Sequence, residues 1–220
     1  MLRKFHIKSF LLILIISSVN ILEANDTNHV LKKNRKIVFL GNSITEFWPQ
    51  YTNFFSKNEL YINKGISGQT TTQMLKRFQI DVIDENPYSV IILAGINDIA
   101  QNMGPITIYE IAENIIKMTE LATEKNINVI VCSVLPANKF MWNLSINPTY
   151  KVIYLNSLLK NYCKKNNFAF IDYYSKMTDW GGGLKTPQYT SKYDLVHPNK
   201  KGYEKMEEIL LNILKKKALK

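Results

Sequence analysis

The feature that most constrains the fold of this chain is a regular alternation between two kinds of segment. Short runs rich in Ile and Val recur at residues 37–40, 60–62, 90–94, 129–134 and 168–171. Such runs are typical of strands buried on both faces, as in a parallel sheet. Longer stretches with helical spacing follow each run. The order strand–helix therefore repeats five times, which predicts a mostly parallel sheet covered by helices on both faces.

Most of the longer stretches carry an apolar stripe, and a further helix is expected at residues 44–55. The stripes consist of Met74, Leu75, Phe78 and Val82; Ile108, Ile111, Ile115 and Ala122; Val152, Leu155, Leu158, Leu159 and Tyr162; and Tyr203, Met206, Ile209, Leu210 and Ile213. In open α/β sheets the ligand binds beyond the carboxyl ends of the strands. The loops to search therefore follow Leu40, Ile62, Ala94, Val134 and Ile171.

The N-terminus has the layout of a secretory signal peptide. Arg3, Lys4 and Lys8 precede an apolar run at residues 10–16, and small and polar residues follow. The expected division is a signal peptide at residues 1–24 and one domain at residues 25–220. This division predicts export to the periplasm or the extracellular space, with no stable membrane span after cleavage, because the apolar run is short. The alternative is an uncleaved N-terminal anchor.

Composition narrows the class of protein further. Hydrophobic residues make up 46% and charged residues 21% of the 220 residues, which indicates a globular domain. The formal net charge of +10 would suit nucleic acid or an anionic membrane, but a solvated basic surface is favoured and no nucleic-acid partner is expected. Cys132 and Cys163 lie in apolar patterns and are expected as buried thiols, with a disulfide as the alternative. The sequence leaves the oligomeric state open.

A serine follows the first predicted strand. In the loop at residues 41–45, Gly41 permits a tight turn, and Ser43 lies at the junction between the predicted strand and the following helix. A hydroxyl there is exposed at the sheet edge, close to backbone N–H groups that can stabilise an oxyanion. The alternative interpretation of Ser43 is an ordinary helix N-cap.

Two further loops offer hydrogen-bond donors. Gly65 and Gly68 lie in the loop after the second strand and allow the backbone to approach a ligand, although a plain turn is the alternative. Ser67 lacks the glycine spacing of a Gly-x-Ser-x-Gly nucleophile motif, and no dinucleotide or phosphate-binding glycine pattern is present. Asn97 follows the third strand, where its amide is able to donate toward Ser43 or to form an Asx turn.

His197 is nearly the only candidate for a base suited to neutral pH. Its rival after the signal peptide, His29, lies in the polar N-terminal flank, where no core orients it. Asp194 stands three residues before His197, close enough to bond the second imidazole nitrogen. A helix-capping Asp beside an incidental His is the alternative. The four loops together predict a serine, two donor groups and an Asp/His pair at one edge of the sheet.

The combination of these motifs resembles the SGNH hydrolases, also called the GDSL family. The resemblance extends over residues 36–215, and it is specific because four marker blocks occur in order. The blocks are Gly41-Asn42-Ser43-Ile44-Thr45, Gly65-Ile66-Ser67-Gly68, Gly95-Ile96-Asn97-Asp98 and Asp194-Leu195-Val196-His197. It implies a flavodoxin-like three-layer α/β/α sandwich with a five-stranded parallel sheet in the order 2-1-3-4-5. It also implies ester hydrolysis through an acyl-enzyme, without a metal or a cofactor.

The resemblance also implies a role for each matching residue. Ser43 corresponds to the nucleophile, His197 to the base and Asp194 to the residue that orients the base. The N–H groups of Ser43 and Gly68 and the side chain of Asn97 correspond to the oxyanion hole. The chain departs from the family pattern in having Asn42 where an Asp is usual. Because that Asp braces the loop and carries no proton, little loss is expected.

Residues 63–78 and 93–100 resemble a bacterial branch near the acylhydrolases that are similar to platelet-activating-factor acetylhydrolase. This likeness implies a serine esterase for short acyl groups, especially acetyl, on small-molecule or carbohydrate esters. A lysophospholipase or thioesterase acting on lipids is the alternative, and Trp48 and Trp142 are candidate substrate-binding residues in both cases. A non-catalytic binding domain and a flavin- or nucleotide-binding domain are rivals from other classes. The first is disfavoured because a degenerate module should have lost a catalytic residue, and none of Ser43, Asn97, Asp194 and His197 is missing. The second leaves the Asp194/His197 pair without a role.

Overall fold

The structure, a computed structural model, describes residues 36–218, and the predicted signal peptide at residues 1–24 lies outside this part of the chain. Its centre is a five-stranded sheet in the order β2-β1-β3-β4-β5, in which every pairing is parallel. The strands are β1 (Ile37–Gly41), β2 (Tyr61–Gly65), β3 (Ser89–Leu93), β4 (Asn128–Cys132) and β5 (Ala169–Ile171). The predicted fold class and strand order are confirmed.

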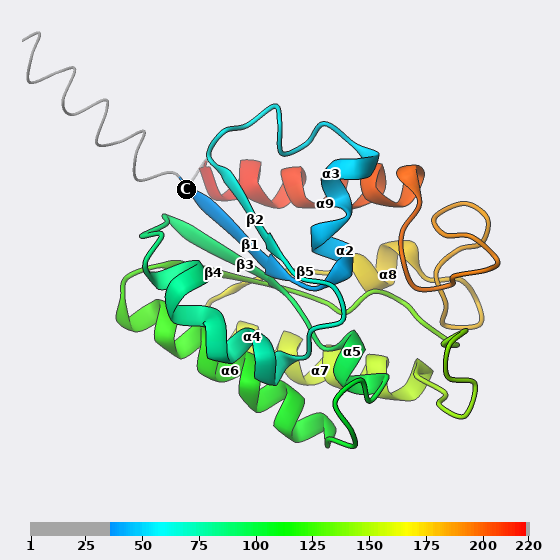
Figure 1. Cartoon of the computed structure of the whole chain (residues 1–220). Coiled ribbons are helices and arrows are strands. Elements are labelled where there is room, and N and C mark those ends of the chain that lie inside the picture. The colour runs from blue at the N-terminus through cyan, green and yellow to red at the C-terminus, as the bar shows by residue number, and fades with distance from the viewer. Residues whose placement is uncertain (1–35, 219–220) are drawn as a thin grey trace, which may run out of the picture.

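Helices cover both faces of the sheet and give three layers (Figure 1). One face carries α4 (Thr71–Phe78), α6 (Ile108–Glu124) and α7 (Thr149–Lys165). The other carries α2 (Ser43–Glu46), α3 (Trp48–Tyr51), α8 (Tyr173–Met177) and α9 (Lys200–Ala218). Two shorter elements complete the fold: the π-helix η1 (Gln79–Ile83) continues α4, and α5 (Ile96–Ile99) follows β3.

The central strands are apolar because both of their faces meet helices. All residues of β3 are buried, and so are the last four residues of β1. The edge strand β2 is only half-buried throughout, so it tolerates polar residues such as Asn63 and Lys64. This contrast is the expected result of covering a parallel sheet on both sides.

The predicted helix at residues 44–55 is wrong: two short helices take its place. The chain turns at Phe47 between α2 and α3, and it leaves α3 at Thr52, which is extended with φ −143°. Pro49 lies in the first turn of α3, where its missing N–H does not matter. Inside one continuous helix the same ring would clash with the carbonyl of the preceding turn.

The register of the strands brings three loops to one place. Gly41, at the end of β1, pairs with Gly65 of β2 on one side and with Leu93 of β3 on the other. The chain therefore leaves these three strands side by side, and the loops that begin there emerge at the same edge of the sheet (Figure 1). This edge is the carboxyl edge, where open α/β sheets bind their ligands.

Both cysteines are buried free thiols in the structure, and they do not form a disulfide. Burial raises the pKa of Cys163 to about 11 and raises the pKa of Cys132 further. Such thiols stay protonated and behave as small apolar side chains. Among residues 36–218, no helix combines the length and the apolar character needed to cross a membrane.

Candidate active site

The turn after β1 holds a serine side chain at the carboxyl edge of the sheet. Asn42 is extended, with φ −106° and ψ −150°, and its side-chain oxygen accepts a hydrogen bond from Ile44 N at 3.0 Å. This N-cap contact fixes the start of α2, so Ser43 becomes its first residue. Ser43 is buried, with 7% of its surface exposed.

Ser43, His197 and Asp194 form one continuous series of hydrogen bonds. Ser43 Oγ lies 2.8 Å from His197 Nε2, although 154 positions separate the two residues. His197 Nδ1 lies 2.8 Å from Asp194 Oδ2 and 3.0 Å from Oδ1. Because a carboxylate only accepts, we assign the ring proton to Nδ1, which leaves Nε2 to accept from the serine hydroxyl. These distances suit proton transfer from Ser43 to His197.

The turn before His197 orients the imidazole through the backbone. Asp194 Oδ1 accepts the N–H of Val196 at 3.1 Å and that of His197 at 2.9 Å. Leu195 has φ +67°, a left-handed conformation that leucine rarely adopts and that costs about 1–3 kcal/mol. Thr190 donates its hydroxyl to the His197 carbonyl at 2.7 Å. Hydrogen bonds to the backbone N–H and to the carbonyl of His197 thus hold the strained turn in place.

Two opposing effects act on the pKa of Asp194. Partial burial raises this pKa, whereas the hydrogen bonds from the His197 ring and backbone lower it and prevail. The pKa therefore lies below the ordinary value of an aspartate, and the carboxylate remains ionised in mildly acidic solution. An ionised partner at this position stabilises positive charge on the imidazole when it takes up a proton.

Gly68 lies in the loop after β2, and Asn97 lies in the short helix α5 of the connection after β3; the two connections are hydrogen-bonded to each other. Asn97 Nδ2 donates to the Gln69 carbonyl at 3.0 Å, and Asn102 Nδ2 donates to the Gly68 carbonyl at 3.2 Å. Gly68 has φ +76°, a backbone conformation that favours glycine. An amide group carries two hydrogens, so Asn97 retains one donor beyond its bond to Gln69. The structure therefore brings the predicted donors onto adjoining loops beside Ser43.

The strand ends pack against α2 with almost no space between them. A Cβ on Gly41 would stand 2.0 Å from Thr45 Oγ1, and one on Gly65 would stand 2.1 Å from the backbone N of Glu46. Asn63 adds a hydrogen bond from Nδ2 to the Thr45 carbonyl at 2.7 Å. Glycine at both positions thus lets the helix that carries the serine lie directly on the sheet edge.

Glu46 is a residue at this site that the sequence did not predict. Its Oε2 accepts the backbone N–H of Ser67 at 2.8 Å and also accepts the Ser67 hydroxyl. These contacts tie α2 to the loop that holds Gly68. They also occupy the Ser67 hydroxyl with a structural bond. No spacing in the sequence signals this contact between residues that are 21 positions apart.

The buried carboxylate of Asp98 connects α5 to the start of α4. Asp98 is 1% exposed, and its carboxylate accepts Thr71 N at 3.0 Å and Thr71 Oγ1 at 2.6 Å. Burial raises the pKa of Asp98, and the hydrogen bonds from Thr71 oppose that effect without cancelling it. The marker block 95–98 therefore supplies the Asn97 donor and also attaches the start of α4.

The two predicted substrate-binding tryptophans lie in different environments. Trp48 is 2% exposed, stacks on Phe54 at a centroid distance of 5.4 Å and donates Nε1 to Glu207 at 3.0 Å. This position corrects the expectation that Trp48 contacts substrate, because its ring belongs to the aromatic core. Trp142 is 51% exposed and lies 5.0 Å from the ring of Phe140, which is buried. Trp142 therefore keeps a face available to a ligand.

Three of the cavities in the described part of the chain have volumes of about 620, 360 and 350 Å³, and neither Ser43 nor His197 lines these three. The second is lined by Thr70 and Asp98, which are close in sequence to the predicted donors, and its wall is of mixed polarity. Within residues 36–218, no group of three or more His, Cys, Asp and Glu side chains is placed to hold a metal ion.

The sequence and the structure were compared with known proteins. The sequence model of one family, described as the GDSL-like lipase/acylhydrolase family, matches residues 39–205. A comparison with curated proteins finds no significant match.

Several solved structures are similar to this chain. A GDSL-like lipase from Bacteroides thetaiotaomicron shares 42% identity with a TM-score of 0.79, over 84% of this chain and 90% of that chain. A lipase/acylhydrolase from Enterococcus faecalis shares 25% identity with a TM-score of 0.67, over 83% and 96%. An acetyl-xylooligosaccharide esterase from a Geobacillus species has the same fold at 19% identity, with a TM-score of 0.63 over 81% and 93%.

Proposed function

This chain belongs to the GDSL-like lipase/acylhydrolase family and is an ester hydrolase, and we propose that it removes short acyl groups, foremost acetyl, from carbohydrate esters through an acyl-enzyme on Ser43. The observation that carries the proposal is the series of hydrogen bonds from Ser43 through His197 to Asp194. A serine hydroxyl is a weak nucleophile by itself, and a base within hydrogen-bond reach activates it.

In the first half of the reaction, His197 Nε2 takes the proton of Ser43 while Oγ attacks the ester carbonyl. The ring becomes positively charged, and Asp194 stabilises that charge from the opposite nitrogen. His197 then gives the proton to the departing alcohol, which leaves the acyl group on Ser43. In the second half, His197 takes a proton from water as the water oxygen attacks the acyl carbon. It then returns the proton to Ser43 Oγ as the bond between Oγ and the acyl carbon breaks, which releases the acid and restores the serine.

The carbonyl oxygen becomes an oxyanion in both halves. We assign its stabilisation to the N–H groups of Ser43 and Gly68 and to the free hydrogen of the Asn97 amide. The loops that carry these donors are attached to one another by the Asn97–Gln69 hydrogen bond. Donors that are held in place before the reaction cost no reorganisation when the charge develops.

The cavity beside Asp98 supports a short acyl group. Its lining combines the polar side chains of Thr70, Gln73 and Asp98 with the apolar side chains of Met103, Pro105 and Ile106. A long acyl chain needs a continuous apolar groove, and polar side chains interrupt this lining. We infer a carbohydrate as the alcohol part because the proposed signal peptide at residues 1–24 would bring the enzyme to extracellular or periplasmic polysaccharide.

A series of p-nitrophenyl esters tests the acyl group. We expect kcat/KM for acetate and butyrate to exceed that for octanoate and palmitate by at least ~10-fold, because each extra methylene must find an apolar contact to be tolerated. Acetylated xylo-oligosaccharides and acetylated monosaccharides, followed by released acetate, then test the alcohol part. Activity that peaks at the long esters would point instead to the lipid acylhydrolase.

Replacement of Asn97 by Ala tests the assigned oxyanion donor. We expect kcat on p-nitrophenyl acetate to fall by about 10²- to 10³-fold, because one donor to the developing charge is lost. Asn128→Ala is the matched control, since Asn128 Nδ2 also donates to a backbone carbonyl, that of Tyr88 at 2.9 Å, but at the opposite edge of the sheet. Equal activities in the two variants would remove Asn97 from the oxyanion hole.

A further inference from the structure

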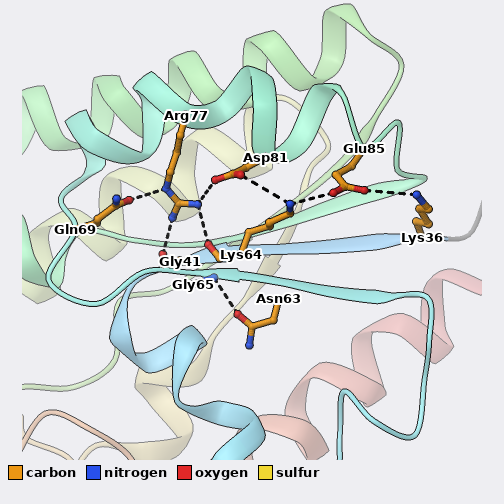
Figure 2. Close-up of polar contacts among 9 residues, drawn as sticks. All are labelled: Lys36, Gly41, Asn63, Lys64, Gly65, Gln69, Arg77, Asp81 and Glu85. Carbon is orange, nitrogen blue, oxygen red and sulfur yellow. Dashed lines mark hydrogen bonds and ion pairs between the residues drawn. The ribbon is translucent and has the colours of Figure 1, made fainter.

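One arginine at the carboxyl edge donates to acceptors on several separate segments (Figure 2). Arg77, in α4, donates Nη2 to the Gly41 carbonyl at 2.9 Å and Nη1 to the Lys64 carbonyl at 2.9 Å. Its Nε donates to Gln69 Oε1 at 2.6 Å. These acceptors belong to the end of β1, the end of β2 and the loop before α4, so a single guanidinium connects three parts of the chain.

The acceptors adjoin the groups of the proposed reaction. Gly41 is two residues before Ser43, and Gln69 is the residue after Gly68. The Gln69 carbonyl in turn accepts the hydrogen bond from Asn97 Nδ2. Arg77 therefore touches the nucleophile segment and the segment between two proposed oxyanion donors, without contacting any reacting atom.

The guanidinium is itself held by a row of alternating charges (Figure 2). Arg77 pairs with Asp81, and both side chains are largely buried, at 13% and 18% exposure. Lys64 then bridges Asp81 and Glu85 at 3.8 and 2.9 Å, and Lys36 pairs with Glu85 at 3.5 Å. The hydrogen bond from Lys64 is the main cause that lowers the pKa of Glu85, so this carboxylate stays ionised at neutral pH. A partly buried row of this kind restricts the position of the guanidinium fork.

We propose that Arg77 is a positioning residue, which sets the distance between the Ser43 turn and the Gly68–Asn97 donor loops by bridging the Gly41 carbonyl and the Gln69 side chain. The inference rests on the proposed function. Its physical basis is the planar fork of arginine, which offers five N–H donors in fixed directions. A lysine would supply the charge but only one donor centre, so it is unable to hold three acceptors of this geometry.

Arg77→Ala and Arg77→Lys test the inference in the full-length protein with p-nitrophenyl acetate. We expect kcat to fall by about 10- to 100-fold in both variants, because a small misplacement of oxyanion donors relative to the nucleophile costs this much. We expect KM to change less than about 3-fold, since a donor that acts in the transition state contributes little to ground-state binding. Lysine should not restore kcat even though it keeps the charge.

Lys117→Ala is the matched control, because Lys117 pairs with Glu113 at 2.8 Å across one helical turn of α6 and is exposed. It should leave kcat unchanged. Active sites are counted by the stoichiometric reaction of Ser43 with a fluorophosphonate and by intact-protein mass. Unchanged kcat per active site in Arg77→Ala would reduce Arg77 to a structural role and overturn the inference. Wild-type kcat in Arg77→Lys would overturn it too, because charge alone would then suffice.

The two proposals fail in different ways. If Ser43→Ala keeps the wild-type activity, the proposed function itself is wrong. If Ser43→Ala is inactive while both Arg77 variants turn over normally, only the positioning role is wrong. Both proposals are supported if Ser43→Ala is inactive and both Arg77 variants have a reduced kcat with a nearly constant KM.

Discussion

Replacement of Ser43 by Ala is expected to lower kcat on p-nitrophenyl acetate by at least about 10⁴-fold while the protein stays folded. The variant lacks the hydroxyl oxygen that lies 2.8 Å from His197 Nε2 and that we propose forms the acyl-enzyme. Its donor loops and the Asp194/His197 pair remain, so a small residual rate from positioned water is the most that should survive. Steady-state kinetics, with circular dichroism as the check on folding, measures the result.

Two other serines serve as controls for this variant. Ser157→Ala changes an exposed residue of α7 whose hydroxyl donates only to the Tyr154 carbonyl, and it should leave kcat unchanged. Ser67→Ala removes the serine that is bonded to Glu46 and should keep most of the activity. A large loss of activity in Ser67→Ala together with an active Ser43→Ala would show that Ser43 is not the nucleophile and would point to Ser67. A non-catalytic binding domain, in contrast, would show no turnover in the wild-type protein.

Asp194→Asn is the second substitution with a large expected effect. The amide oxygen can keep the hydrogen bonds from Val196 N and His197 N, so the turn persists. The amide nitrogen, however, is a donor and faces His197 Nδ1, which must then be an acceptor. The ring proton moves to Nε2, and Nε2 is no longer able to take the proton of Ser43. We expect kcat to fall on the order of 10⁴-fold by this change of tautomer.

The matched control for Asp194→Asn is Asp172→Asn. Asp172 is also a half-buried aspartate with a lowered pKa, and its Oδ1 accepts Ser175 N at 3.0 Å to cap α8. Its Asn variant keeps the cap, and we expect kcat to stay within about 3-fold of the wild type. Similar activities of Asp194→Asn and the wild type would show that Asp194 does not orient His197.

The lowered pKa of Asp194 also fixes the sign of a stability effect. A carboxylate whose pKa is lower in the folded protein stabilises the fold above the pKa of an unfolded aspartate, about 3.9. This stabilisation is lost as the pH falls through the lower folded value. The difference in unfolding free energy between the wild type and Asp194→Asn should thus be constant at neutral pH and shrink in acid. Urea unfolding at a series of pH values measures it.

Much of the fold could be predicted because its signals are local. An Ile- and Val-rich run needs only its own residues to indicate a buried strand, and the alternation with helical stripes implies the parallel sheet. The loops that matter follow from the same pattern, because the carboxyl ends of parallel strands share one edge. Ser43, Gly68, Asn97 and His197 were predicted as site residues in this way, each at the end of a strand or in the turn before the last helix.

The predictions failed where contacts between residues far apart in the sequence outweighed a local sequence pattern. Residues 44–55 have helical spacing, but Pro49 and the turn at Phe47 divide them into two short helices. Trp48 stands close to Ser43 in the sequence and for that reason was expected at the site. Its ring instead packs against Phe54 and bonds Glu207, which is 159 positions away. Proximity to Ser43 along the chain therefore does not determine whether a side chain points into the site or into the core.

The sequence by itself determined the sheet, the order of its elements and the kinds of side chain that collect at its carboxyl edge, because periodicity and turn residues act over a few positions. Only the tertiary structure decided the 2.8 Å contact between Ser43 and His197 and the left-handed turn at Leu195. It alone also showed the contacts of Glu46 and Arg77 that hold the loops together. Such contacts join a side chain to a distant backbone group, and any residue type offers the same backbone acceptor. Such contacts therefore leave no pattern in the sequence from which they could be predicted.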